Sequence, residues 1–257
     1  FRTIPSDSLQ ASAIAQAVEG TGARGVTLAF LNDVYGRPFA DAVRTALSRR
    51  GISVTSSQPI NADEASIRAT AQAIATVDAP VVVVIADATT GPALVQATDD
   101  LSSGSPQYVV NDSFRRTPLT NPYSTRLARR IVGVAPAAMA PKPFLDSLLT
   151  IDAQATGVYA TNAYDCVNLV ALAAQAAGSS QPRSIAAGIV IASASGSPCQ
   201  TFAACNDSLI AGRNIDYDGP SGALDLGVDG DPTRAVFEQF AVDDSGRDSV
   251  VAKLTVG

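Results

Sequence analysis

Histidine and tryptophan are absent from this sequence of 257 residues, and its two lysines are Lys142 and Lys253. Without histidine, the chain lacks the general base that most nucleophilic hydrolases use. It also has no Gly-x-Ser-x-Gly elbow, no Gly-x-Gly-x-x-Gly after a predicted strand and no P-loop lysine. We therefore expect no catalytic residues, no cofactor and no enzymatic activity.

Long apolar runs and blocks of like charge are also missing. The longest candidate run is Val81–Ala86, far short of the roughly 18 to 20 apolar residues that cross a bilayer. The net charge of -6 comes from 24 acidic and 18 basic residues, with no block of five or six like charges. We expect neither a membrane-spanning segment nor a nucleic-acid partner.

Cysteine is scarce, and two of the three cysteines lie close together. Cys199 and Cys205 are six residues apart in a loop-like stretch, a spacing that closes a small disulfide if the chain is exported. Two unrelated thiols are the alternative, and a zinc site is disfavoured because two sulfurs without histidine leave the metal short of ligands. Cys166 lies on an apolar helical face, so we expect it in the core.

What the sequence does have is 46% hydrophobic residues and an alternation of strand and helix periodicities. Such alternation is typical of an α/β domain with a parallel, doubly wound sheet. Strands are predicted at 26–30, from 52, at 81–85 and at 107–110, with helices at 7–19, 39–50, 64–76 and 90–101. Because parallel strands end at the same side of a sheet, the loops at Asn32, Ala86 and Asn111 should line one crevice.

The second half of the sequence has a different pattern of predicted elements. Residues that break helices and strands (proline, glycine and asparagine) are closely spaced in residues 117–143. This pattern predicts a crossover segment around a short strand at 130–134. Helices are predicted at 144–152, 162–177 and 184–192, and closing antiparallel strands at 235–242 and 250–256.

Several motifs, in this order and spacing, resemble the Leu/Ile/Val-binding family of periplasmic solute receptors. They are Phe1–Asp7, Asn32–Gly36, Ala163–Leu169, Ile215–Gly222 and Gly230–Pro232. The family usually has alanine where Cys166 stands, and its corresponding tail follows a small disulfide loop. The resemblance covers nearly the whole chain.

This resemblance implies the α/β fold of type I periplasmic binding proteins, with a doubly wound parallel-sheet lobe and an incomplete second lobe. Residues 1–130 and 213–257 would form the family's second (C-terminal) lobe, and 131–212 the remaining part of the first. The N-terminal part of the first lobe, which opens family members, has no counterpart here. The implied function is capture of a small amino-acid-like ligand between two lobes for an ABC importer.

The resemblance also implies site residues. Tyr35 matches an aromatic ring that covers the ligand, although it could simply cap the turn before Gly36. Asp112 matches the acidic group that receives an α-ammonium, although it could form an Asx-turn or helix N-cap, and Asn111 could exchange roles with it.

Three further site residues are predicted with less support. Ala86 and Asp87 lie in a loop that carries a second aromatic in many relatives. Here the loop is small and polar, which disfavours a ligand with a large apolar side chain, and Asp87 could be a helix cap instead. Tyr159, just before the 162–177 helix, is a first-lobe candidate that could also be purely structural.

The resemblance places the protein outside the cytoplasm, lipid-anchored in its full length, with a membrane permease as partner. The rival function is a ligand-sensing ectodomain of a receptor or kinase, since the same clamshell closure can report occupancy to a regulator. The present sequence does not separate the two.

Overall fold

The computed structural model describes residues 1–257 except 116–122, 138–139, 156, 158 and 195. Contacts divide the chain into two compact units. The sheet unit comprises residues 7–136 and 236–256, and the helical unit comprises residues 1–6, 137–235 and 257. The lobe boundaries at 130/131 and 212/213 stay a prediction.

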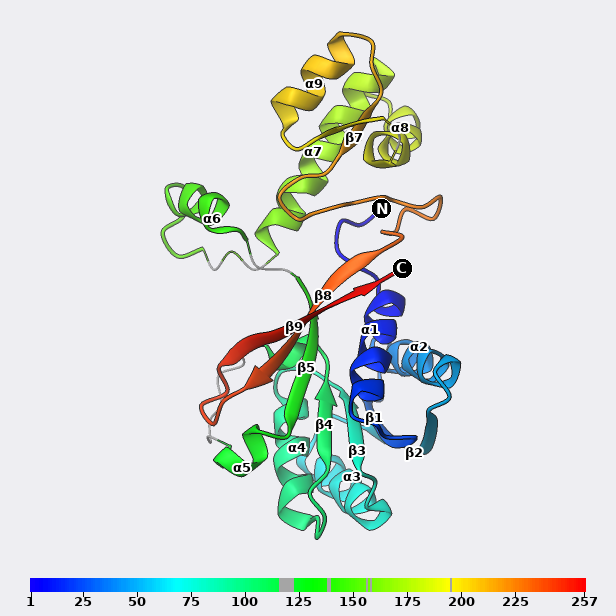
Figure 1. Ribbon diagram of the computed structural model, residues 1–257, viewed down its shortest axis with the longest axis vertical. Helices are drawn as coiled ribbons and strands as arrows, with labels where there is room; N and C mark the ends of the chain where they lie inside the picture. Colours follow the sequence, from blue (N-terminus) through cyan, green and yellow to red (C-terminus); the bar gives the residue numbers. More distant parts are fainter. Residues whose placement is uncertain (116–122, 138–139, 156, 158, 195) are drawn as a thin grey trace. The chain divides into compact units, whose positions relative to one another are not determined.

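The sheet unit is built on a seven-stranded sheet in the order β2-β1-β3-β4-β5-β8-β9 (Figure 1). Strands β1 to β5 pair in parallel, and β8 pairs antiparallel with β5. The central strand β3 is buried along its whole length, as expected for a parallel strand covered on both faces. The strands are β1 (Gly25–Leu31), β2 (Ser53–Ile60), β3 (Val81–Ile85), β4 (Gln107–Val110), β5 (Ile131–Pro136), β8 (Ala235–Val242) and β9 (Asp248–Val256).

Two pairs of helices belong to this sheet: α1 packs on α2, and α3 packs on α4. The core formed by α3 and α4 takes alternate strand residues, such as Val82 and Val84 of β3, because successive side chains of a strand point to opposite faces. The doubly wound parallel sheet predicted from the sequence is confirmed in this unit. The helices are α1 (Asp7–Gly20), α2 (Gly36–Arg49), α3 (Glu64–Val77) and α4 (Thr90–Leu101), with the short η1 (Asp112–Phe114) and α5 (Thr125–Ala128).

The helical unit packs helix on helix beside a small sheet. Its α7 contacts α8 and α9, and its two-stranded sheet joins β6 to β7 in parallel. Of the predicted crossover 117–143, residues 117–122 and 138–139 lie outside the described residues. The elements are α6 (Lys142–Leu149), α7 (Ala160–Ala177), α8 (Pro182–Ala194), β6 (Ser197–Cys199), α9 (Phe202–Ile210) and β7 (Ile215–Tyr217).

Two expectations about the helical unit are wrong. The stretch around the cysteines is not a loop throughout, because α9 begins at Phe202 once the Thr201 hydroxyl accepts a hydrogen bond from the Ala204 amide. Cys166 is exposed and not in the core, because the buried face of α7 runs through Asp165 and Leu169 and the next residue turns about 100° away.

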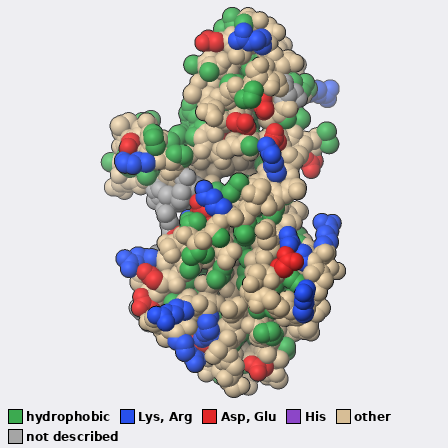
Figure 2. Space-filling model, viewed as in Figure 1, with side chains coloured by type: hydrophobic (Ala, Val, Ile, Leu, Met, Phe, Trp, Pro, Cys, Tyr) green, Lys and Arg blue, Asp and Glu red, His purple; other side chains and the backbone are tan. Residues whose placement is uncertain are grey.

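Within the described part of the chain, no helix is long and apolar enough to cross a membrane. On the face drawn in Figure 2, basic and acidic side chains are interspersed over both units. A surface of this kind offers no continuous basic stripe on that face for a phosphate backbone to follow.

Gly133 of β5 makes room for the side chain of its partner in β8. The two residues pair across the antiparallel strands, and a Cβ at position 133 would lie 1.9 Å from Cζ of Phe240. Phe240 is fully buried and part of the core on the α3 and α4 side of the sheet.

We predict that Gly133→Ala lowers the free energy of unfolding by about 1–3 kcal/mol, because the ring must shift within a close-packed core. Urea denaturation followed by circular dichroism measures the change. Gly20→Ala is the matched control, since no atom lies within 4 Å of a Cβ there. Equal stability of the two variants would contradict this packing account.

Candidate functional site

Three strands of the sheet unit place their carboxyl ends side by side. Phe30 of β1 is in register with Ile85 of β3, and Val84 of β3 with Val110 of β4. The residues that follow, from Asn32, Ala86 and Asn111 onward, therefore begin at one end of the sheet. We call this the carboxyl end of the sheet.

Asn111 holds two of these loops together. Its Oδ1 accepts hydrogen bonds from the Ala86 amide at 3.3 Å and from Ser113 Oγ at 3.1 Å, and its Nδ2 donates to the Tyr35 hydroxyl at 3.2 Å. Ser113 Oγ also donates to the Ala86 carbonyl. These four residues form the rim cluster. Asn111 is 0% exposed, so this amide lies behind the surface and holds Tyr35 from within.

The loop before α2 presents Tyr35 at the surface. Asp33 Oδ1 accepts hydrogen bonds from the amides of Tyr35 and Gly36, at 3.0 and 2.6 Å. The capping side chain is therefore Asp33 and not Tyr35. The Tyr35 ring meets Phe39 edge-to-face at 5.7 Å between centroids and remains 37% exposed. A ring fixed at both ends gives a flat apolar face with a hydroxyl at one side.

Gly36 allows this loop to turn tightly into α2. A Cβ at position 36 would lie 2.1 Å from the Leu31 carbonyl oxygen, so no other residue fits without moving the backbone.

Asp112 lies in the same region and is held by a residue from α1. Its Oδ1 accepts a hydrogen bond from Nε2 of Gln10 at 2.9 Å. Asn111, the residue that precedes the short η1 helix, makes no side-chain cap hydrogen bond to it. Asp112 is half-buried, which suits a group at a rim.

Ion pairs lie close in sequence to Asp112. Arg115, three residues further on, is mostly buried and pairs with Asp248 at 2.9 Å and with Glu238. Its guanidinium also lies over the Phe240 ring, 5.9 Å from the centroid. The two carboxylates that Arg115 contacts, Asp248 and Glu238, take up its charge.

The helix N-termini at the carboxyl end carry their own acidic caps. Asp33 caps α2, Asp63 accepts from the Ser66 amide at the start of α3, and Asp87 accepts from the amides of Thr89 and Thr90 at the start of α4. Free amides at a helix N-terminus commonly bind anions. In this unit, carboxylates of the chain itself occupy that role at three helices.

The predicted site residues therefore fall into separate groups. The structure brings Tyr35, Ala86 and Asn111 together and places Asp112 next to them. Asp87 serves as the cap of α4, one of the two alternatives for it, and any contact of Asp87 with a ligand stays a prediction.

Tyr159 belongs to the helical unit, where it precedes α7 with φ of 56°. A tyrosine in this left-handed region carries backbone strain, which is tolerated only where the surroundings fix it. Its part in a ligand site stays a prediction.

Sequence reasoning missed several neighbours of this site. Gln10 is separated from Asp112 by about a hundred positions, so no local pattern links them. Val34 projects its apolar side chain into solvent, 96% exposed, directly before Tyr35. The sequence did contain an indication of this exposed residue, because Val34 is an apolar residue in the turn between the capping Asp33 and the aromatic Tyr35.

Two grooves of the sheet unit lie away from the rim cluster. One of about 530 Å³ includes Gln107 and Arg130, at the opposite end of β4 and β5. Another, of about 330 Å³, lies between α3 and α4 and includes Ile67 and Ala93. Neither of these two grooves includes the rim cluster or Asp112. We call the rim cluster and Asp112 together the wall.

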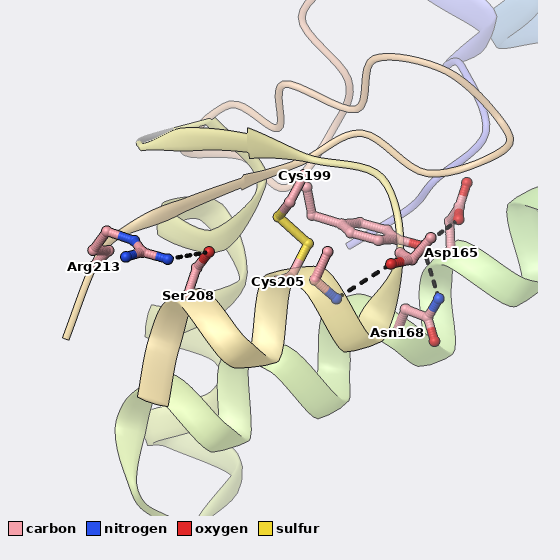
Figure 3. Close-up of a disulfide and its surroundings, with 9 residues drawn as sticks. Asp165, Asn168, Cys199, Cys205, Ser208 and Arg213 are labelled. Carbon is pink, nitrogen blue, oxygen red and sulfur yellow. Dashed lines mark hydrogen bonds between the residues drawn. A yellow bond between two sulfur atoms is a disulfide. The ribbon is translucent and has the colours of Figure 1, made fainter. Parts of the chain in front are cut away.

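The disulfide between Cys199 and Cys205 is confirmed and joins the end of β6 to α9 (Figure 3). Among the described residues, no group of three or more Cys, Asp and Glu is arranged to hold a metal ion.

A buried carboxylate lies next to this disulfide. Asp165 of α7 is 0% exposed and accepts hydrogen bonds from the Tyr217 hydroxyl at 2.7 Å and the Ser221 amide at 2.8 Å. Asn168 donates to the same hydroxyl at 2.7 Å. Burial raises the pKa of Asp165 above its ordinary value, and the hydrogen bonds from Ser221 and Tyr217 partly oppose the rise.

Comparison with known proteins supplies the family. The profile of the family described as the receptor family ligand binding region matches residues 1–245. The chain belongs to this family. No curated protein sequence matches the chain.

Solved structures share the fold at low sequence identity. A leucine-binding protein from Thermotoga maritima superposes with a TM-score of 0.71 at 14% identity, covering 98% of this chain and 67% of that one. A branched-chain amino acid transporter substrate-binding protein from Streptococcus pneumoniae, in complex with isoleucine, gives 0.66 at 17% identity, covering 98% and 65%.

A solute-binding protein from R. palustris, in complex with benzoate, gives a TM-score of 0.67 at 12% identity, covering 100% of this chain and 66% of that one. The chain thus spans about two thirds of the length of these proteins. The type I periplasmic binding fold and the resemblance stated above are confirmed.

We predict that Asp165 makes the unfolding free energy depend on pH. Because its folded pKa is raised, its contribution to stability is greatest below the usual value of 3.8 and falls as pH rises through the folded pKa. Asp165→Asn should remove this decline, as measured by urea unfolding between pH 3.5 and 7. Asp207→Asn, exposed on α9, is the control, and an unchanged pH profile in Asp165→Asn would contradict the prediction.

Proposed function

We propose that this chain is the ligand-binding part of an extracytoplasmic solute-binding protein, which captures a small amino-acid-like ligand between two lobes for an ABC importer. The observation that carries the proposal is the wall formed by the rim cluster and Asp112. The exposed ring of Tyr35 is held by the buried amide of Asn111, and the next residue, Asp112, carries a half-buried carboxylate. This pairing suits a guest with an apolar part and an ammonium group.

The charges around the wall favour a cationic group on the ligand. The Arg115 guanidinium is paired with Asp248 and Glu238, and the N-termini of α2, α3 and α4 are closed by aspartates. A ligand carboxylate would meet repulsion here, whereas an ammonium would gain a charge-assisted hydrogen bond. We infer that the sheet unit receives the ammonium and that the other lobe receives any carboxylate, with Tyr159 as a candidate contact.

The ligands of the similar structures agree with a small guest. Those proteins bind leucine, isoleucine or benzoate according to their descriptions. Residues 86–89 carry no aromatic in this chain, which favours a ligand of modest apolar size. A ligand that binds the closed form of the two lobes more tightly than the open form would shift the equilibrium toward the closed form.

The disulfide supports a place outside the cytoplasm, because such bonds persist in oxidising compartments. We also propose that the full-length protein is lipid-anchored and that its partner is a membrane permease. The alternative is a ligand-sensing ectodomain of a receptor or kinase, which the family's description as a receptor region favours. Reconstitution with a permease separates them, since ligand-dependent ATP hydrolysis by the permease complex supports the importer.

We predict that Asp112→Asn weakens leucine binding about tenfold or more, because a hydrogen bond between charged groups is worth about 1.5–3 kcal/mol. The measurement is an NMR titration of backbone amides 33–36 and 111–113, which also detects millimolar affinities. Asp41→Asn, an exposed acid on α2, removes the same charge and should leave the affinity unchanged.

The comparison probe is 4-methylpentanoate, which has leucine's apolar part and carboxylate but no ammonium. Its affinity should be the same for the parent chain and for Asp112→Asn, or rise in the variant. Leucine that leaves these amides unshifted, or binds Asp112→Asn as well as the parent, would overturn the role of Asp112.

A further inference from the structure

The groove of about 530 Å³ lies at the amino end of β4 and β5, the opposite end of these strands from the wall. Gln107 and Val109 of β4 are two positions apart, so their side chains share one face of the sheet, and Val132 of β5 is in register with Val109. The last turns of α1, from Gln16 onward, also line the groove. We call it the amino-end groove, and its volume is within the range of small-molecule pockets, roughly 300–1,000 Å³.

Three glutamines from three different elements line the amino-end groove. They are Gln16 of α1, Gln107 of β4 and Gln239 of β8. Gln107 is exposed and the other two are half-buried, and their side-chain amides have no hydrogen-bond partner within the described part of the chain. A primary amide both donates and accepts hydrogen bonds. Three such amides complement a ligand that carries donors and acceptors side by side, as peptide groups do.

Arg129 gives the amino-end groove a positive charge that the chain does not compensate. Of the other two charged residues in its lining, Glu19 pairs with Arg50, and Arg130 pairs with Asp99. Arg129 is exposed and forms no ion pair with any described residue, and the residues outside the described part include no aspartate or glutamate. A guanidinium keeps its charge and matches the geometry of a carboxylate. The free charge in this groove therefore favours an anionic group on the ligand.

The sheet side of the amino-end groove is aliphatic. Val109, Val132 and Leu254 line it, and Tyr108, the aromatic residue of the lining, is 1% exposed. The groove thus offers a ligand aliphatic side chains and no open ring face. Such a surface suits small aliphatic groups placed between polar contacts.

We propose that the amino-end groove is a second ligand site, which binds a short peptide with a free carboxylate. Arg129 binds the carboxylate, the three glutamines bind the peptide groups, and small side chains lie against the aliphatic surface. This inference is independent of the proposed function, because the groove lies at the other end of the strands and its ligand needs no ammonium group.

The experiment is an NMR titration of the chain with N-acetyl-alanyl-alanine, which has one carboxylate, two peptide groups and no ammonium. We expect shifts of the backbone amides of Gln107, Val109, Val132 and Gln239, while amides 33–36 and 111–113 stay unshifted. The matched probe is N-acetyl-alanyl-alaninamide, in which a neutral amide replaces the carboxylate. It should bind about tenfold more weakly, because it loses a charge-assisted hydrogen bond.

Three variants separate the contributions. Arg129→Gln should weaken the carboxylate probe about tenfold and leave the amide probe unchanged, since only the first probe loses a charged partner. Arg126→Gln, an exposed arginine of α5 outside the groove, removes the same charge and should change neither affinity. Gln239→Met keeps the shape but removes one amide, so it should weaken both probes equally, by about threefold.

Each contrary result has a definite meaning. Groove amides that stay unshifted at the highest soluble probe concentration would overturn the site. Equal losses in Arg129→Gln and Arg126→Gln would reduce the effect to general surface charge and would also overturn it. Glucuronate carries a carboxylate with hydroxyl groups in place of peptide groups, and tighter binding of glucuronate than of the peptide probe would overturn the peptide class. The proposed function is tested separately, with leucine and amides 33–36 and 111–113.

Discussion

The common direction of β1, β3, β4 and β5 is the constraint on which the site depends. Parallel strands in register must end together, so the loops after β1, β3 and β4, which are far apart in sequence, begin one or two strand spacings of about 4.8 Å from each other. The chain needs no special device to bring Tyr35, Ala86 and Asn111 together. It needs only to supply suitable side chains immediately after each strand.

Buried polar groups then convert this proximity into fixed geometry. The Asn111 amide is worth little as a single hydrogen bond, but leaving its neighbours without partners inside the sheet unit would be costly. The same reasoning applies in the helical unit, where Asp165 links α7 to the segment after β7 beside the disulfide. In both places, a fully buried polar side chain specifies where a loop must lie.

The sequence predicts the sheet unit well because its signals are local. Val81–Ile85 is a short apolar run between turn residues, and the Gly36 and Asp33 pair marks a capped turn into a helix. Each such signal depends on residues within one or two turns of the chain. Hydrophobic periodicity and strand direction together were enough to place the loops at Asn32, Ala86 and Asn111 at one end of the sheet, whereas Tyr35 was singled out by the family resemblance.

The predictions that were wrong or missing concern features that short stretches of sequence do not determine. The start of α9 depends on the Thr201 cap within a polar stretch whose composition favours a loop. Cys166 was assigned to the core because α7 is apolar on more than one side, and Val167 on this helix is 69% exposed. The contact of Gln10 with Asp112 depends on the packing of α1 against β4 and β5, which no periodicity encodes.

The caps of the helix N-termini bear on the kind of ligand that we propose for the wall. Helix N-termini would ordinarily make the carboxyl end of a parallel sheet attractive to anions. Here Asp33, Asp63 and Asp87 satisfy those amides from within, and Asp112 adds a carboxylate oriented by a neutral amide. The positive ends of these helices are thereby satisfied within the chain, so a ligand carboxylate would find these amides already occupied.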